Sequence, residues 1–98
     1  MPEPGSVAGQ HATWTEQAAA WDRWADRTEK MAERFNQPIV EAVGVRPGDR
    51  VLDLASGVGE PGLTIHKAIQ PGGRLILSDL AEAMLAGAAR RFRSRGLD

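Results

Sequence analysis

The 98-residue chain contains no cysteine, carries little net charge and has no long apolar run. The absence of cysteine excludes disulfide bonds, a thiolate nucleophile and a zinc site with cysteine ligands. A formal net charge of −1 at pH 7 creates no global field that would attract nucleic acid or an anionic membrane. A membrane-spanning helix needs about 20 consecutive apolar residues, and no such stretch is present. With 42% hydrophobic and 26% charged residues, the chain has the composition of a soluble globular domain.

Signals for secretion, metal binding and serine chemistry are missing as well. The first residues lack the basic segment and apolar run of a secretory signal peptide, so the expected location is the cytoplasm. The two histidines, His11 and His66, are isolated from each other and do not form a metal cluster. No Gly-x-Ser-x-Gly motif surrounds Ser56, and no histidine is placed to activate it. We therefore expect no metal, no nucleic acid and no membrane among the partners.

The segment from Asp49 to Leu63 is the most informative part of the chain. An apolar strand is followed there by an acidic residue, a glycine-rich bend and the start of a helix. Gly57 and Gly59 have no Cβ, so the chain can adopt positive φ and a ligand can approach the backbone N–H groups closely. The N-terminus of the next helix would direct its free N–H groups and its positive dipole end to the same place. The segment therefore predicts a ligand-binding bend.

Two classes of ligand use a bend of this kind, and the surrounding residues distinguish them. Residues 57–62 read G-x-G-x-x-G, and Asp79 follows 20 residues after Gly59, as in the dinucleotide-binding fingerprint. Asp53, however, lies near the end of a strand that would be uniformly apolar in a dinucleotide-binding protein. Glu60 adds a negative charge where a pyrophosphate would have to lie. These two acids favour a ligand without phosphates, and an NAD(P)-dependent oxidoreductase is the first alternative.

Two motifs carry a resemblance to a known family. Residues 51–59, VLDLASGVG, resemble the first motif of class I S-adenosylmethionine-dependent methyltransferases, D-x-G-x-G-x-G in outline. Ala55 replaces the first glycine, a departure that a small side chain should tolerate. Residues 73–88, GRLILSDLAEAMLAGA, are similar to the second motif, G-x-(apolar)-x-x-x-D-x-x-x-x-M-L-x-x-A. The resemblance covers residues 14–95 and is closest to the small-molecule and ubiquinone-biosynthesis-like branch.

This resemblance implies a cofactor, an activity and a set of site residues. The cofactor would be S-adenosyl-L-methionine, and the full-length protein would transfer a methyl group to a small-molecule acceptor. Asp53 would orient the methionine portion, and Gly57 and Gly59 would receive it. Asp79 would bind the ribose, and Leu80 would contact the adenine. The predicted cofactor-binding residues lie in the bend and at the ends of the two strands: Asp53, Ala55, Ser56, Gly57, Gly59, Asp79 and Leu80.

Each of these assignments has a structural alternative. Asp53 is equally suited to hydrogen-bond the loop backbone and tie the bend together, a role that is compatible with ligand binding. Asp79 is suited to be the N-cap of the following helix. The two glycines are suited to be turn residues alone. Ser56 is interpreted as a structural residue or a minor contact.

The hydrophobic pattern predicts an α/β fold, the N-terminal portion of a Rossmann-like methyltransferase fold. Two N-terminal helices should be followed by a β-α-β-α unit with two parallel strands. We expect a flexible arm at residues 1–12, a helical cap at 13–45 and the incomplete first half of the cofactor-binding domain at 46–98. The expected strands and helices of that half run over residues 50–55, 61–69, 74–78 and 81–95.

The cap is predicted to contain one long amphipathic helix from Trp14 to Phe35, with an aromatic stripe along one side. The first interpretation of this stripe is core packing. The second is that part of it, Trp24 especially, forms a lid over the cofactor cleft. A short second helix is expected to begin at Pro38 and to end at Gly44.

The last predicted helix ends in a group of arginines, Arg90, Arg91, Arg93 and Arg95. Cations at a helix C-terminus complement the helix dipole, and this is the favoured interpretation. The alternative is a contact with an anion or with RNA.

Two parallel strands leave edges unpaired and apolar faces without cover. We therefore interpret the chain as the cofactor-binding N-terminal part of a methyltransferase, with the catalytic residues expected beyond Asp98. The isolated 98-residue chain should be inactive. It should form a homo-oligomer through the unpaired strand edge or by exchange of a helix. The second alternative is a non-enzymatic ligand-binding or assembly module.

Overall fold

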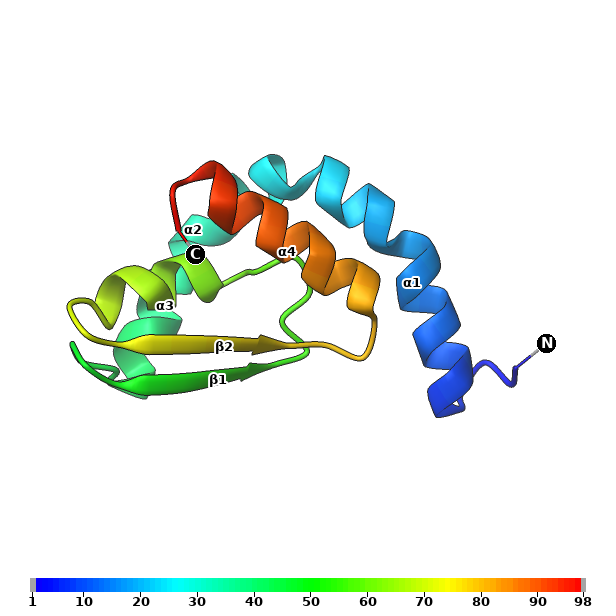
Figure 1. Cartoon of the computed structure of the whole chain (residues 1–98), viewed down its shortest axis with the longest axis horizontal. Helices are drawn as coiled ribbons and strands as arrows, with labels where there is room; N and C mark the ends of the chain where they lie inside the picture. Colours follow the sequence, from blue (N-terminus) through cyan, green and yellow to red (C-terminus); the bar gives the residue numbers. More distant parts are fainter. Residues whose placement is uncertain (1, 98) are drawn as a thin grey trace.

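The computed structural model describes residues 2–97, which form an α/β unit of helices and a small sheet (Figure 1). In Figure 1 the helices α3 and α4 lie above the strands, and the strand arrowheads point toward α1. The predicted fold class is confirmed: two N-terminal helices precede a β-α-β-α unit. The elements follow in the order α1 (Val7–Arg23), α2 (Ala25–Val43), β1 (Arg50–Leu54), α3 (Gly62–Ala68), β2 (Arg74–Ser78) and α4 (Glu82–Ser94).

The two strands are parallel, as a helical crossover between them requires. Their register pairs Arg50 with Arg74 at one end and Leu54 with Ser78 at the other. The backbone N–H of Ser56 donates to the carbonyl oxygen of Ser78 at 2.9 Å, so the pairing extends into the glycine bend. Because parallel strands share a carboxyl end, the bend after β1 and the residues after β2 emerge side by side.

The two faces of the sheet differ in their cover. On the covered face, a Cβ added at Gly62 of α3 would lie 3.2 Å from Leu77 Cδ2, so this helix packs closely on β2. On the opposite face, Leu52, Leu54 and Ile76 are each more than half exposed. Alternation along the strands therefore places apolar side chains on both faces, and only one face is buried.

The predicted arm at residues 1–12 is wrong for its second half, because α1 begins at Val7. Ser6 is the N-cap, and its Oγ accepts a hydrogen bond from the Gly9 N–H at 3.0 Å. The Gln10 side chain also donates to the Pro4 carbonyl oxygen at 3.0 Å. These local hydrogen bonds satisfy groups that a helix start leaves free, so the helix begins before the aromatic stripe does.

The single helix expected from Trp14 to Phe35 is also wrong, because the chain turns at Trp24. This residue has φ −97° and ψ 8°, and it separates α1 from α2. At the turn Ala25 becomes almost fully buried, which favours the corner over a straight helix. The expected second helix is absent as a separate element, since α2 runs through Pro38. It ends at Gly44, which has φ 77°, as the sequence predicts.

The core between the helices and the bend consists mainly of small side chains. Small residues allow close approach of the backbones, and the large aromatic rings of α1 and α2 stay outside this cluster. The interpretation of the stripe as core packing is therefore confirmed for Ala18 and Ala25, which are buried, and wrong for the aromatic rings, which are exposed. The buried cluster contains Ala18, Ala25, Val58, Ala81 and Met84.

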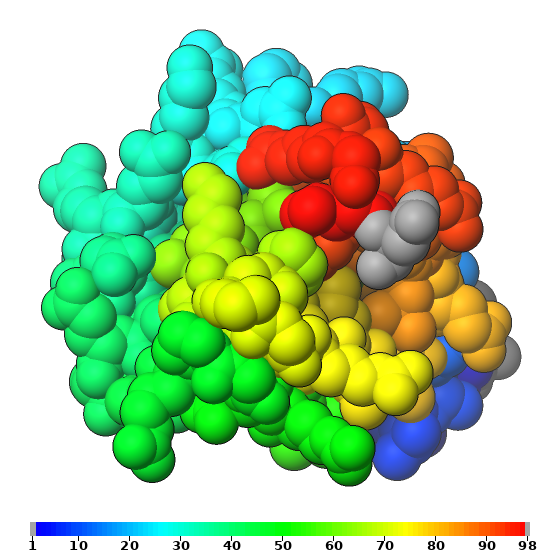
Figure 2. Space-filling view, turned by 60° about the vertical axis from the view of Figure 1, so that its left-hand side comes forward, coloured from blue at the N-terminus to red at the C-terminus, as the bar shows by residue number. Residues whose placement is uncertain are grey.

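The outer side of α2 carries several apolar side chains that project into solvent. Phe35, Ile39 and Val43 are each at least half exposed. Figure 2 shows this helix, coloured cyan to blue-green, with side chains projecting from one flank of the molecule. Within residues 2–97, no helix combines the length and the apolar character needed to cross a membrane.

Candidate cofactor-binding site

A cavity of about 660 Å³ lies where the two N-terminal helices meet the glycine bend and the end of β2. Its walls combine indole rings and small apolar groups with a few polar side chains, which is typical of a small-molecule site. The lining residues are Gln10, Trp14 and Trp21 of α1, Thr28 and Ala32 of α2, Ala55, Ser56, Gly57, Val58 and Glu60 of the bend, and Asp79, Leu80 and Met84 after β2.

Most of the predicted cofactor-binding residues lie on this cavity. The two that do not are Asp53 and Gly59. The structure therefore brings together residues from the ends of both strands, as their shared carboxyl edge requires. The predicted residues that line the cavity are Ala55, Ser56, Gly57, Asp79 and Leu80.

Asp79 connects the bend to the start of α4. Its Oδ2 accepts a hydrogen bond from the Gly57 N–H at 2.9 Å, and its Oδ1 accepts one from the Ala81 N–H at 2.9 Å. The N-cap of α4 is Ala81, so the alternative that Asp79 is itself the N-cap is wrong. A carboxylate has about four lone-pair sites. Asp79 therefore retains acceptor capacity on the cavity side after holding the bend and the helix.

The first part of the bend is left-handed at two positions. Ala55 has φ 56°, and Gly57 has φ 57°. A Cβ added at Gly57 would have no atom within 4 Å, so backbone conformation rather than crowding requires glycine there. Ala55 has the same conformation with a side chain, at a cost of about 1–2 kcal/mol. The alanine is accommodated, as expected from its small size, but in a strained backbone.

Gly59 lies on the opposite side of the bend, against α4. It has φ 103°, and a Cβ added there would lie 2.9 Å from Phe92 Cε1 and 3.7 Å from Arg91 Nη1. Gly59 is buried, and this close approach gives it a packing role. Its role in cofactor binding stays a prediction.

Asp53 contributes a buried acceptor beneath the bend. Its Oδ2 has no hydrogen-bond partner among residues 2–97, and the same holds for the Oγ of Ser56. Burial raises the pKa of the Asp53 carboxyl, and the negative charge of Asp79 raises it further. The interpretation of Asp53 as a tie to the loop finds no support at Oδ2. Buried polar atoms without a hydrogen-bond partner are rare in folded proteins, and here two of them lie at or beneath the bend.

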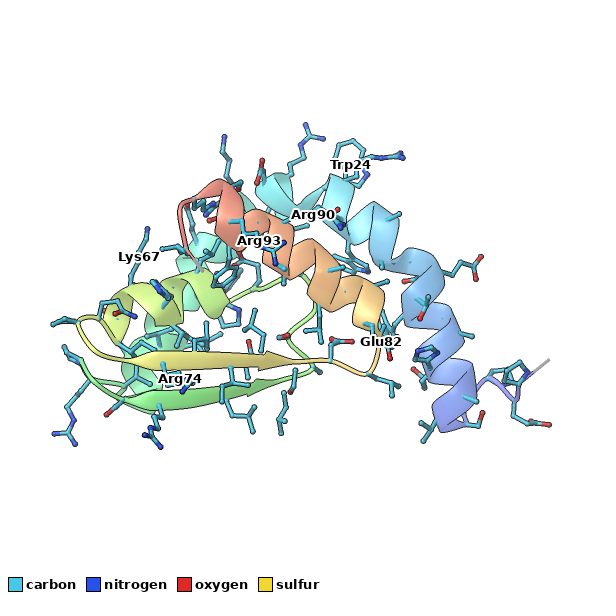
Figure 3. All side chains as sticks on the ribbon, in the orientation of Figure 1. Trp24, Lys67, Arg74, Glu82, Arg90 and Arg93 are labelled. Carbon is cyan, nitrogen blue, oxygen red and sulfur yellow. The ribbon has the colours of Figure 1, made fainter. Side chains whose placement is uncertain are left out.

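Two tryptophans on the cavity wall were not among the predicted site residues. Trp14 and Trp21 line the cavity, whereas Trp24 does not. Trp24 stands at the α1–α2 junction on the side remote from the sheet (Figure 3), with the Arg27 guanidinium 5.6 Å from its ring centroid. The assignment of Trp24 as the principal lid residue is therefore wrong. The seven-residue spacing of Trp14 and Trp21, two helical turns, was the sequence signal for a shared face.

Arginines of α4 and of its C-cap bind carboxylates of the two N-terminal helices. Arg90 pairs with Asp22 of α1 at 2.6 Å, and Arg95 donates from Nη1 to Glu29 Oε1 of α2 at 2.6 Å. The hydrogen bond from Arg95 lowers the pKa of the Glu29 carboxyl. These pairs join segments more than 60 residues apart, and no sequence pattern indicated them.

The parallel βαβ unit, with a glycine bend and an acid at the carboxyl edge of the strands, defines part of a Rossmann-like α/β fold. The chain belongs to the ubiE/COQ5 methyltransferase family, whose model matches residues 26–98. This membership confirms the predicted resemblance to class I methyltransferases of the ubiquinone-biosynthesis branch.

Two curated relatives illustrate the similarity. The ubiquinone/menaquinone biosynthesis C-methyltransferase UbiE of Ectopseudomonas oleovorans is 38% identical over 68 residues, which cover 69% of this chain and 38% of the relative. The protein of the same name from Pseudomonas entomophila (strain L48) is 38% identical over 68 residues, covering 69% of this chain and 25% of the relative. The matched segment thus spans well under half of these relatives. No solved structure matches the chain.

Proposed function

We propose that this chain is the S-adenosyl-L-methionine-binding part of a methyltransferase that acts on a small-molecule acceptor. The observation that carries the proposal is the meeting of Gly57 and Asp79 on one cavity, joined by a hydrogen bond of 2.9 Å. An open backbone and a carboxylate with free lone pairs are the groups that a nucleoside carrying an amino acid would need. In this proposal, residues 46–98 are the first half of the cofactor-binding domain and residues 13–45 are its helical cap.

The proposed roles follow the chemistry of the side chains. Asp79 accepts hydrogen bonds from the ribose hydroxyls, and Leu80 contacts the adenine. Asp53, which lies beneath the bend and does not line the cavity, attracts the ammonium of the methionine portion through its negative charge. The backbone at Gly57 and Gly59 receives the same portion, and Ala55 and Ser56 complete the wall. These residues bind and orient the cofactor, and the residues that position the acceptor are expected outside this chain.

S-adenosyl-L-methionine supplies a methyl group that its sulfonium already activates. The protein's part in such a transfer is chiefly alignment and exclusion of water. Trp14 and Trp21 support this role, because their indole rings form a wall of the cavity. An indole face also favours a cationic ligand, by about 0.5–2 kcal/mol.

The two alternatives have less support. A dinucleotide would place its pyrophosphate near Glu60, an acidic residue that lines the cavity. A purely non-enzymatic module would have no reason to belong to a methyltransferase family. We infer in addition that the protein acts in the cytoplasm. We also infer that the isolated chain forms a homo-oligomer through the open sheet edge or helix exchange, and that it transfers no methyl group.

Ligand titration tests the proposal directly. Isothermal titration calorimetry and thermal unfolding should be run with S-adenosylmethionine, S-adenosylhomocysteine and NAD at equal concentrations. A ligand that binds only the native state stabilises it by RT ln(1 + [L]/Kd), or about 2.7 kcal/mol at a hundredfold excess over Kd. The S-adenosyl ligands should raise Tm and NAD should not. Stabilisation by NAD alone would replace the proposal with its oxidoreductase alternative.

A further inference from the structure

A buried guanidinium lies behind the second part of the bend. The Arg91 side chain of α4 is only 7% exposed. Its Nη1 donates to the Val58 carbonyl oxygen at 2.6 Å, and its Nη2 donates to Glu60 Oε1 at 3.2 Å. Val58 and Glu60 both lie on the cavity wall, so one side chain holds two wall residues from behind.

Helix α2 holds the same part of the bend from the other side. Asn36 Nδ2 donates to Glu60 Oε2 at 2.6 Å, so both carboxylate oxygens of Glu60 are hydrogen-bonded. Glu29 Oε2 accepts from Arg91 Nη2 at 3.2 Å. The hydrogen bond from Arg95 lowers the pKa of Glu29, so this carboxylate stays ionised opposite Arg91. The bend, α2 and α4 are thereby connected through a single buried arginine.

The geometry of this connection requires arginine in particular. A buried cation must be paired and hydrogen-bonded, and each such bond is charge-assisted and strong. The guanidinium is planar and has several donors in a fixed fork, which reach a carbonyl and two carboxylates at once. A lysine ammonium is a single point charge and would not span the same three acceptors.

We propose that Arg91 is a positioning residue of the cofactor site. It holds Val58 and Glu60 in place, while Asp79 holds Gly57, so the bend is clamped at both ends. Loss of the Arg91 clamp releases one end and shifts the Gly57 N–H and the cavity wall. The link to cofactor affinity rests on the proposed function, whereas the clamp itself does not.

Amide hydrogen exchange measured by NMR tests the clamp without a ligand. The Gly57 N–H is bonded to Asp79, and the Gly59 N–H is bonded to Ser56 O at 3.0 Å. In Arg91→Met, exchange at these two amides should accelerate on the order of tenfold, while amides of β1 and β2 keep wild-type rates. Arg90→Met is the matched control, because it removes an arginine–carboxylate pair of the same helix that does not contact the bend.

Cofactor affinity gives the second measurement. Arg91→Met should raise the Kd of S-adenosylmethionine on the order of tenfold, with Arg90→Met within about twofold of wild type. Arg91→Lys should lie between them, because it retains a charge and loses the fork. If Arg91→Met does not fold, Arg91→Lys carries both measurements, and wild-type values for it would overturn the proposal.

Exchanging the amide and the carboxylate between Asn36 of α2 and Glu60 of the bend provides a rescue experiment. In Glu60→Gln the one amide oxygen replaces two acceptor oxygens, so the amide NH2 must face a donor of either Asn36 or Arg91. In Asn36→Asp two carboxylates face each other. Each single variant should raise both the exchange rate of the Gly57 and Gly59 amides and the Kd of S-adenosylmethionine severalfold. The double variant restores one donor and one acceptor at unchanged net charge, so it should return both values to near wild type.

The outcomes separate the two proposals. If Arg91→Met folds and its bend amides exchange at wild-type rates, the clamp is refuted. If the bend amides exchange faster in Arg91→Met but the wild-type protein binds no S-adenosyl ligand, the clamp is supported and the proposed function is refuted.

Discussion

The two parts of the glycine bend each contain a glycine with positive φ, but the two glycines have different surroundings. Residues 55–57 face the cavity, are held by Asp79 and include two left-handed positions. Gly59 does not line the cavity and packs against Phe92 and Arg91 of α4, although Val58 and Glu60 on either side of it lie on the cavity wall. A glycine pattern therefore indicates where the backbone is unusual. It does not indicate whether the missing side chain makes room for a ligand or for the protein itself.

Gly59→Ala should have the largest effect on stability. The new Cβ would lie 2.9 Å from Phe92 Cε1 in a backbone at φ 103°, so strain and overpacking combine to about 3 kcal/mol. Gly57→Ala should cost only about 1 kcal/mol, since open space surrounds its Cβ position. Urea unfolding of both variants measures the difference. Equal losses would remove the distinction between the two parts of the bend.

Asp79→Ala should affect ligand binding more than folding. It removes the acceptor for the Gly57 N–H and the proposed ribose contact, at about 1–3 kcal/mol of S-adenosylmethionine affinity. Calorimetry measures the affinity, and circular dichroism checks that the fold is retained. Glu82→Ala, an exposed acid in the first turn of the same helix (Figure 3), is the control. Equal affinities in both variants would reduce Asp79 to a local support of α4.

Asp53 should make stability depend on pH. Burial, assisted by Asp79, raises its native pKa above the ordinary value of 3.8, so the native state binds this proton more tightly than the unfolded state. Its contribution to stability is therefore greatest below that ordinary pKa and is lost as pH rises through the raised native pKa. Asp53→Asn lacks this titration, so its stability relative to wild type should improve as the pH rises from 3.5 to 7.

Urea unfolding at the two pH values tests this expectation, with Asp49→Asn as an acid-to-amide control in the loop before β1. Identical pH dependence in wild type and Asp53→Asn would show that the buried carboxylate has no energetic consequence. Cofactor affinity should fall in Asp53→Asn at pH 7 in any case, because the neutral amide attracts an ammonium less.

Ala55→Gly should give the smallest effect, and a favourable one. Glycine relieves the left-handed strain at φ 56°, and part of this gain is offset by the greater freedom of the unfolded chain. The expected gain is about 0.5–1 kcal/mol in unfolding free energy. A loss of stability in thermal or urea unfolding would mean that the alanine methyl contributes packing that exceeds its strain.

The sequence predicted the strand–bend–helix unit and its parallel partner well, because those features depend on local periodicity and on glycine. It also identified five of the residues that line the cavity, since the segments that follow the carboxyl ends of two neighbouring parallel strands must lie close together. It predicted the N-terminal helices less well. Ser6 starts α1 earlier than the hydrophobic pattern does, and burial of Ala25 turns the chain at Trp24.

The sequence by itself thus determined the fold class, the family and the place of the bend. Only the tertiary structure decided which side of the bend each residue faces, that Trp14 and Trp21 rather than Trp24 reach the cavity, and that Arg91 joins three elements. The physical reason is the sequence separation over which each kind of interaction acts. Backbone conformation and periodicity act over a few residues, whereas the partners of Arg91, Glu29 and Glu60, lie 62 and 31 residues away and meet it only when the helices pack.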